Sequence, residues 1–500
     1  MNKDVTLRDL NPKRVFAFFE KLTQIPRGSG HEKQISDYLV DFAKQRGLSV
    51  EQDKYYNVII RKAASKGCDG APVTMLQNHM DMVCEKLPTV SFDFLTDAIV
   101  PVVDIEKGIV RAAGTSLGAD NGIGLAVALA ILDDDSLRHP PLEVVCTVGE
   151  EIGLVGASEM DMSGLRSEYM ISSDGFELDT VQAGCAGSGY FVAQTDAEWI
   201  DAQGAFPYDC AARITVTGLI GGHSGIDICK QRANANKLVG RLLRNVRAQG
   251  IDIAISGYTC RNSDNSIARE ASCDIVLGSS QLKALESTAQ QVEAALSREL
   301  ALTDPDIRIL LQKMPMPQKY LSRTSTDVFI DYLVLVPDGV FLREHEFTHG
   351  TMAACSANIG RAILTDETIQ IRSMIRSNFD DLLRETFRSF ALLAGRLGMQ
   401  SREERVIPVW EYRADSVLLG ILKDSYRELF HTEIGVAMSH GTSEGGLFRS
   451  AVGCDVVCLG ADIRGNHSPY EIVTIESVGR LYELNVRILE KLAGMTGNAV

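Results

Sequence analysis

Histidine and carboxylate side chains recur in five short polar segments of this sequence. The segments read NHMDM, GADNG, GEEIG, SSDG and GNHSPYE; GADNG precedes an apolar helix pattern, and the others follow apolar, β-branched runs. Imidazole nitrogens and carboxylate oxygens are suitable ligands for Zn²⁺, and also for Mn²⁺ or Co²⁺. The shared placement, rather than the rarity of any one residue, indicates a metal site built from His79, Asp81, Asp120, Glu150, Glu151, Asp174 and His467.

The make-up of this set predicts two metal ions and a hydrolytic reaction. One histidine and one carboxylate for each ion, with a further carboxylate shared between them, would complete a two-zinc site. Two ions roughly 3.5–4 Å apart can hold a hydroxide and polarise a carbonyl group. Asp81, two residues after His79, is placed to orient the imidazole. Glu150, beside the candidate ligand Glu151, is placed to take a proton from the attacking water.

Each motif taken alone has an ordinary structural interpretation. Asp120 before a helix could be an N-cap, and so could Asp174 in its turn. A single His-x-Asp or Glu-Glu pair is usually part of a solvated turn. All five motifs, however, lie next to strands or helices of one predicted domain, and this shared placement favours a functional site.

The elements that would position these residues alternate between strands and helices. Strand-like runs occupy residues 58–60, 73–76, 142–148 and 169–171, with helical patterns at 31–46 and 122–132. The same alternation returns near the end, with a helix at 416–429, a strand at 455–459 and a helix at 470–492. This pattern predicts an α/β catalytic domain with a mixed, largely parallel sheet and helices on both faces. Ligands bind such sheets at the carboxyl ends of the strands, where the polar segments lie.

The middle of the chain follows a different pattern. Arg213–Thr217 alternates like a strand with one exposed face, Ala233–Arg247 resembles a helix, and a strand at 369–371 precedes a helix at 380–397. We therefore expect an inserted α+β domain at 187–399, which divides the catalytic domain into segments 1–186 and 400–500.

Composition argues against several classes of function. The 500 residues include 50 Lys and Arg against 66 Asp and Glu, a net charge of −16 that disfavours an extended nucleic-acid surface. No apolar, uncharged run reaches the roughly 18 residues that suggest a membrane span. The first residues, MNKDVTLRDLNPKRVFAFFEKL, lack the continuous apolar region of a signal peptide, and the 11 cysteines include no C-x-x-C pair. These features predict a cytoplasmic protein with reduced thiols.

The motifs NHMDM, GADNG, GEEIGLVGA, SSDG and NHSPYE, in this order and spacing, resemble the zinc exopeptidases of the M20 type. Within that family they look most like the cytosolic aminoacyl-histidine, or nonspecific, dipeptidases, and the resemblance spans nearly the whole chain. It implies two zinc ions per subunit and a homodimer formed through the inserted domain. It also implies these roles: His79 and Asp174 bind one ion, Glu151 and His467 bind the other, Asp120 bridges, Asp81 orients His79, and Glu150 is the general acid and base.

The inserted domain carries further candidates that the resemblance suggests. His223 in GGHSG would stabilise the tetrahedral oxyanion, often in the partner subunit's site, although it could instead only organise a turn. Arg372 in IQIRSMIRS would bind the substrate's terminal carboxylate, because a guanidinium fork suits a carboxylate geometrically. Arg376, four residues later, is the alternative, and plain surface arginines are the default interpretation.

One loop of the second catalytic segment departs from the family pattern. It reads SHGTSEGG, where a sequence nearer HAGLECG is expected. Glu444 in this loop is a candidate for holding the free α-amino group of a dipeptide, and His440 is equally well explained as structural. The departure leaves open how the substrate's N-terminal side is handled.

These observations predict a metallo-dipeptidase in which a metal-bound hydroxide attacks the peptide carbonyl and Glu150 carries the proton. N-acyl amino acid deacylation or carboxypeptidase action at the same site is the alternative, and a requirement by Glu444 for a free amino group would separate them. An inactive metal-binding regulator is a third reading. This interpretation is weakened because the sequence retains the candidate base Glu150 together with all of the candidate metal ligands.

Overall fold

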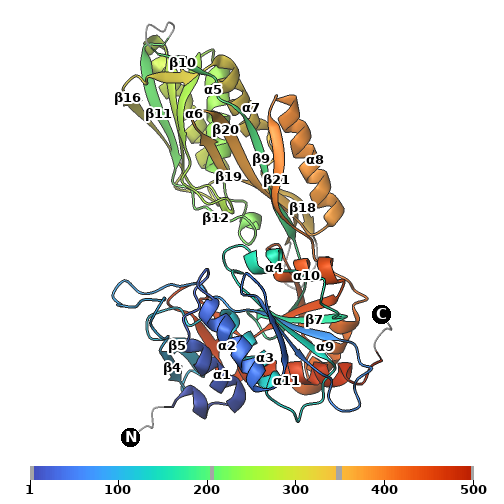
Figure 1. The fold of residues 1–500 in the computed structure, drawn as a ribbon. Coiled ribbons are helices and arrows are strands. Elements are labelled where there is room, and N and C mark those ends of the chain that lie inside the picture. Colours follow the sequence, from blue (N-terminus) through green and yellow to red (C-terminus); the bar gives the residue numbers. More distant parts are fainter. Residues whose placement is uncertain (1–4, 203–207, 345–351, 497–500) are drawn as a thin grey trace. The chain divides into compact units, whose positions relative to one another are not determined.

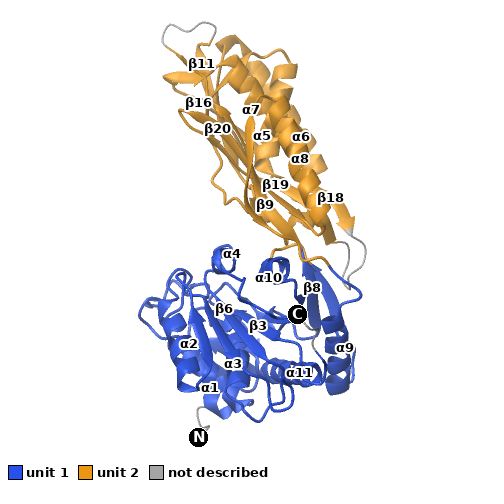
Figure 2. Cartoon of the chain, turned by 45° about the vertical axis from the view of Figure 1, so that its right-hand side comes forward, with its two compact units in different colours: residues 1–185, 412–438, 443–500 blue, residues 186–411, 439–442 orange. Residues whose placement is uncertain are grey.

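The computed structural model describes residues 5–202, 208–344 and 352–496, and these form two compact units (Figure 2). Unit 1 comprises Met1–Cys185, Tyr412–Met438 and Ser443–Val500, and unit 2 comprises Ala186–Glu411 and Ser439–Thr442. The second change of unit lies beyond the boundary at 399–400 that the sequence suggests, because strand β21 (Gln400–Ile407) pairs with β9 (Gly187–Asp196) in a sheet of unit 2.

The main sheet of unit 1 is mixed, with a parallel centre. Strands β6, β3, β7 and β23 run parallel in that order, while β1, β2 and β8 are antiparallel to their neighbours. This sheet confirms the predicted α/β class. Its strands, in spatial order, are β1 (Ser49–Gln52), β2 (Val58–Lys62), β6 (Leu142–Thr147), β3 (Thr74–His79), β7 (Tyr169–Gly175), β23 (Asp455–Gly460), β8 (Thr180–Cys185) and β22 (Gly435–Ser439).

Helix α3 (Ala119–Leu132) packs against β3 and β7 and is buried along its whole length. It is apolar on all sides, as the sequence predicts for a helix inside the core. The flanking helices are amphipathic and bury one face each. They are α1 (Lys13–Thr23), α2 (Lys33–Gln45), α9 (Val417–Phe430) and α11 (Ile475–Leu492), with the shorter α4 (Val155–Glu159) and α10 (Glu444–Val452) completing the unit (Figure 1).

The register of the parallel strands brings their polar ends together. His79, the last residue of β3, is paired with Thr147, the last residue of β6. Gln77 of β3 is paired with Ser172 of β7, two residues before Asp174. Since these strands point the same way, the residues that end them meet at one edge of the sheet.

The C-terminal helix begins at Ile475 rather than at Tyr470 as expected from the sequence. Residues Ile472–Thr474 form strand β25, which pairs with β5, so these residues are extended and the helix starts only after them. This small antiparallel sheet contains β24 (Ile463–Arg464), β25, β5 (Ile109–Ala112) and β4 (Pro101–Asp104).

Unit 2 is an α+β structure of antiparallel sheets with its own apolar core. One sheet contains β13 (Ile253–Thr259), β15 (Ala271–Leu277), β11 (Cys210–Thr217) and β16 (Arg308–Met314). The other contains β18 (Gly339–Glu344), β19 (Met352–Leu364), β20 (Thr368–Ser377), β9 and β21. Two short pairs are β10 (Trp199–Asp201) with β17 (Lys319–Leu321), and β12 (Gly222–His223) with β14 (Ser266–Ile267).

Helices cover both sheets of unit 2. Helix α5 (Ala235–Ala248) packs on β11 and β15, and α8 (Asp380–Arg396) packs on β9, β20 and β21. The remaining helices are α6 (Leu282–Glu299) and α7 (Arg323–Leu335). Across the described parts of both units, none of the helices has the length and apolar character needed to cross a bilayer.

Candidate active site

Unit 1 gathers the histidines and carboxylates singled out in the sequence at one edge of its main sheet. Nε2 of His79 lies 3.0 Å from one oxygen of Asp120 and 3.3 Å from Asp174. Nε2 of His467 lies 2.9 Å from Glu151 and 3.3 Å from the other oxygen of Asp120. Asp120 therefore presents one carboxylate oxygen to each histidine.

The donor atoms fit divalent metal ions. Among the residues that the structure describes, three overlapping groups have ligand atoms within 4.8 Å of one another: His79 with Asp120 and Asp174, His79 with Glu150 and Glu151, and Asp120 with Glu151 and His467. One oxygen of Glu151 is buried without a hydrogen-bond partner among the described residues. Imidazole and carboxylate ligands in this proportion are those that Zn²⁺ and related ions take.

Crowding of negative charge dominates the electrostatics of the site. Burial lowers the pKa of His79, but the Asp174, Asp120 and Asp81 carboxylates outweigh it, so the net pKa lies well above the ordinary value. Hydrogen bonds with Asp120 and Glu151 raise the pKa of His467 to about 10. Metal ions must displace such protons from the imidazoles, and they supply the positive charge in their place.

The same crowding acts on the acids. Burial raises the pKa of Glu150 well above its ordinary value, and the neighbouring Asp174 charge adds to the effect. Burial and Asp120 likewise raise the pKa of Asp174, against the opposing charge of His79. A cluster of carboxylates held in this way favours a bound cation.

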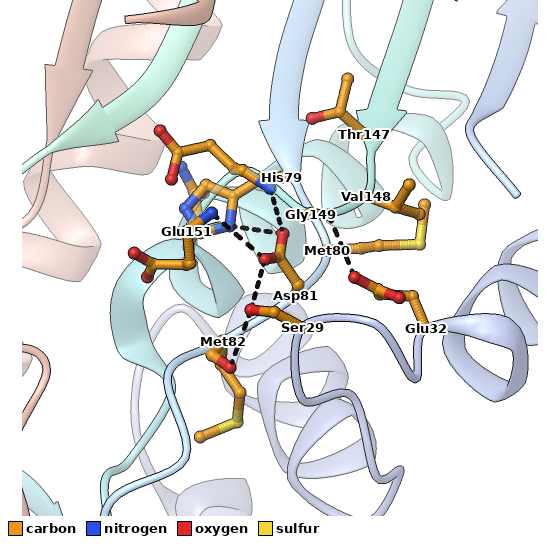
Figure 3. A network of polar contacts seen from close by, with 12 residues as sticks. Ser29, Glu32, His79, Met80, Asp81, Met82, Thr147, Val148, Gly149 and Glu151 are labelled. Atoms are coloured by element: carbon orange, nitrogen blue, oxygen red, sulfur yellow. Dashed lines mark hydrogen bonds and ion pairs between the residues drawn. The ribbon is translucent and has the colours of Figure 1, made fainter. Parts of the chain in front are cut away.

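Asp81 connects the strand carrying His79 to the turn carrying Glu151 (Figure 3). Its Oδ1 lies 3.3 Å from Nδ1 of His79 and accepts the backbone N–H of Glu150 at 3.1 Å, while its Oδ2 accepts the N–H of Glu151 at 3.3 Å. The Ser29 hydroxyl donates to the same carboxylate at 2.7 Å. Asp81 thus lies where it can hold both the imidazole and the turn after β6 in place.

The segment between α1 and α2 supplies contacts that the sequence analysis missed. Oε1 of Glu32 accepts the N–H groups of Gly30 at 2.8 Å and Gly149 at 3.0 Å, so it anchors the start of the turn after β6 (Figure 3). Arg27 donates to backbone carbonyls of the site loops. The only sequence signal for these roles was a charged pair within the glycine-containing stretch PRGSGHE, which is common in exposed loops.

Glu444, the first residue of α10, is buried in unit 1 against side chains of β3 and β6. It is 2% exposed and accepts hydrogen bonds from the Gln77 amide and, at 2.8 Å, from the Thr147 hydroxyl. Burial raises its pKa to about 8. Its other oxygen has no hydrogen-bond partner among the described residues.

Two of the inserted-domain candidates, His223 and Arg376, come together within unit 2, and His440 of the loop Ser439–Thr442 joins them there. A Cβ added to Gly225 would lie 3.1 Å from the His223 ring, 3.1 Å from the His440 carbonyl and 3.3 Å from Nε of Arg376. Nδ1 of His223 accepts the N–H groups of Gly225 and Ile226 at 3.2 Å, which leaves Nε2 to carry the proton. Burial and the Arg376 charge lower the pKa of His223.

His440 and Arg372 have well-defined partners in the same unit. Nε2 of His440 lies 2.7 Å from the Ser356 hydroxyl, and burial lowers the pKa of this imidazole to about 3, so the ring is neutral at pH 7. Arg372 forms ion pairs of 2.9 Å with both Asp264 and Glu404. Its guanidinium is therefore already bound by two carboxylates.

The chain is similar to known peptidases along most of its length. A family model described as peptidase family M20/M25/M40 matches residues 75–491. The cytosol non-specific dipeptidase of Escherichia coli (strain K12) is 34% identical over 490 residues, which cover 97% of this chain and 99% of that protein.

Solved structures agree in fold. The crystal structure of aminoacylhistidine dipeptidase from Vibrio alginolyticus superposes with a TM-score of 0.84 at 30% identity, covering 99% of both chains. A tripeptidase from Staphylococcus aureus matches with a TM-score of 0.55 at 17% identity, covering 97% of this chain and 100% of its own, and so shares the fold alone.

The contacts of Asp81 predict a stability change that does not require metal. In Asp81→Asn one carboxylate oxygen becomes an NH₂ group, which would face the N–H of Glu150 or Glu151 and leave it unsatisfied. We expect the free energy of unfolding to fall by about 1–3 kcal/mol. Urea denaturation in the presence of a chelator measures this, with the exposed Asp41→Asn as control. Equal stabilities of Asp81→Asn and Asp41→Asn would contradict this role.

Proposed function

The chain belongs to peptidase family M20/M25/M40, and from that premise we propose that it hydrolyses dipeptides whose amino and carboxyl termini are both free. The E. coli and Vibrio proteins, which match along nearly their full lengths, are named as dipeptidases. The observation that carries the proposal is the position of Asp120 between two histidine–carboxylate pairs, with Glu150 beside them.

The residues that would hold two metal ions divide into two sets that share Asp120. His79 and Asp174 would hold one ion, and Glu151 and His467 the other. Zn²⁺ suits these donors, and Mn²⁺ or Co²⁺ can replace it. When bound, two such ions activate a water molecule and polarise the scissile carbonyl.

Glu150 would be the group that moves the proton. Its carboxylate accepts a proton from the attacking water and later donates it to the leaving amine, while Asp81 keeps His79 and the Glu150 backbone in position. Burial raises the pKa of Glu150 in the absence of cations, and two divalent ions beside it would bring the pKa back down. Opposing effects of burial and of the ions on the pKa of Glu150 suit a group that must both accept and release a proton.

Recognition of both substrate termini would distinguish a dipeptidase from related peptidases. Unit 2 offers two arginines for the terminal carboxylate: Arg372, which Asp264 and Glu404 bind, and Arg376, which lies beside His223. His223 would donate from Nε2 to the oxyanion of the transition state. Glu444 of unit 1 would receive the substrate's ammonium group.

We further propose a cytoplasmic homodimer that forms through unit 2. Within the described residues β18 is an outer strand of its sheet, and Phe341 and Leu342 on it are 42% and 45% exposed. An open strand edge with apolar side chains is a surface that a second copy can cover. The cytoplasmic location follows the printed name of the E. coli relative, a cytosol dipeptidase.

The metal requirement is tested by removing the ions. A chelator should abolish hydrolysis of Ala-His, because activation of water by the protein's own groups is far weaker than activation by two divalent ions. Zn²⁺, Mn²⁺ or Co²⁺ added after dialysis should restore the rate. Metal content is measured by mass spectrometry on the same samples, and full activity in a sample free of metal would refute the proposal.

The role of Glu150 is tested by separating metal content from rate. Glu150→Ala should retain its metal, because the histidines and the other carboxylates still bind it. It should lose about 10²–10⁴-fold in kcat, the usual range for general acid–base groups. If metal is lost in parallel with activity, the roles of Glu150 and Glu151 are exchanged.

Two-ended recognition is tested with Ala-His, Ala-Ala-His and N-acetyl-Ala-His. The wild-type protein should prefer Ala-His strongly. Replacing the arginine that binds the terminal carboxylate by Lys should lower kcat/KM, because Lys lacks the planar fork. Arg372→Lys and Arg376→Lys, compared side by side, identify that residue. Glu444→Gln should narrow the difference between the free and the acetylated dipeptide.

Equal wild-type rates on the three substrates would overturn two-ended recognition. They would favour a deacylase or a broader peptidase acting at the same metal site.

A further inference from the structure

The turn that leads to Asp120 is held on both sides by buried charged residues that belong to no metal cluster in the described part of the chain. Gly118 has a φ of +69°, in the left-handed region that favours glycine. Its N–H donates to Glu471, and its carbonyl accepts from Arg27. Gly118 is thus bound at its N–H by an anion and at its carbonyl by a cation.

Glu471 is the acceptor for most of this turn. Its Oε2 accepts the N–H groups of Leu117 at 2.7 Å and Gly118 at 2.8 Å, and its Oε1 accepts the N–H of Asp120 at 3.2 Å. The carboxylate is buried and lies at the first residues of α3, where a negative charge is favourable. It comes from the loop after His467, so it connects the bridging ligand to the segment that carries another candidate ligand.

Arg27 binds the opposite side of the turn and a second loop of the site. Besides the Gly118 carbonyl, its guanidinium donates to the carbonyls of Met80 at 3.1 Å and Asp81 at 2.9 Å. A Cβ on Gly118 would lie 2.5 Å from Nη2 of Arg27, so the arginine packs directly against the turn. Arg27 therefore fixes the Asp120 turn relative to the strand end that carries His79.

We propose that Glu471 and Arg27 are positioning residues that fix the Gly118–Asp120 turn and thereby set the affinity of the site for its metal ions. Asp120 can serve both histidines only if its carboxylate stays between them, and three hydrogen bonds to its own turn keep it there. Groups that orient metal ligands in this way typically contribute 10- to 100-fold to affinity. This inference rests on the metal site proposed above.

Two substitutions at Glu471 distinguish the effect of its hydrogen bonds to the turn from the effect of its negative charge. Glu471→Gln keeps the length but places an NH₂ group against backbone N–H donors. Glu471→Asp keeps the charge near Arg27 but is one methylene shorter. If position is what matters, both should weaken binding of Zn²⁺ and Mn²⁺ to the metal-free protein by about 10- to 100-fold, measured by calorimetry. The rate at saturating metal should remain near that of the wild type.

Glu143→Gln is the matched control. Glu143 is also a buried carboxylate of unit 1, and it accepts the Arg166 N–H at 3.0 Å and the Ser167 hydroxyl at 2.6 Å, but it contacts none of the candidate ligands. Its replacement should lower thermal stability without changing metal affinity. Arg27→Lys is a second route to the same result if a Glu471 variant fails to fold, because one ammonium cannot span both loops.

Three outcomes would overturn the inference. Metal affinity could be unchanged in folded Glu471 and Arg27 variants. Glu143→Gln could weaken metal binding equally, which would indicate a general loss of stability. Glu471→Asp could bind metal like the wild type while Glu471→Gln does not, which would assign the effect to charge alone. A wild-type protein that takes up no divalent ion would instead refute the metal site itself.

Discussion

Carboxylates crowded at the carboxyl ends of β3, β6 and β7 repel one another, and unit 1 must supply positive groups and hydrogen-bond donors that offset this repulsion. Burial raises the pKa values of Glu150, Glu151 and Asp174, and the charges of neighbouring carboxylates add to the effect. Within the protein the compensation comes from two histidines and from backbone N–H groups. A cluster of this kind has a strong electrostatic preference for divalent cations, so the same arrangement that makes the metal-free site unfavourable makes it a good receptor.

Holding such a cluster together requires hydrogen bonds that reach across the sequence. Asp81 accepts from the turn after β6, Glu32 anchors that turn at Gly149, and Glu471 accepts from the start of α3. In each case a side chain fixes backbone N–H groups, which lets neighbouring side chains face the centre. Parallel strands bring the loops to one edge, and these contacts then decide where each carboxylate lies.

The sequence was sufficient for predicting the fold class and the proximity of His79, Asp120 and His467, because polar residues that border an apolar strand or helix are a local signal. It was not sufficient for Arg27, Ser29, Glu32 or Glu471. Arg27, Glu32 and Glu471 act through hydrogen bonds to backbone groups distant in the sequence, and Ser29 acts through a hydrogen bond to the Asp81 carboxylate. Contacts of this kind leave no local sequence pattern. For the same reason the start of α11 was misplaced, since pairing of Ile472–Thr474 with β5 is a tertiary contact. The end of the inserted domain also depends on pairing of β21 with β9.

Glu444 illustrates how the proposed chemistry and the fold depend on each other. With a pKa of about 8, raised by burial, its carboxyl group is mostly neutral at pH 7 in the metal-free protein. A neutral carboxyl group is a poor partner for an ammonium group. Cations placed at the neighbouring His79 and Asp174 favour the ionised form, because opposite charges within a few ångströms lower a carboxyl pKa. An arriving ammonium group acts in the same direction. In the role proposed for Glu444, filling of the metal site would prepare its carboxylate for the substrate's amino terminus and so would couple recognition of that end to occupancy of the metal site.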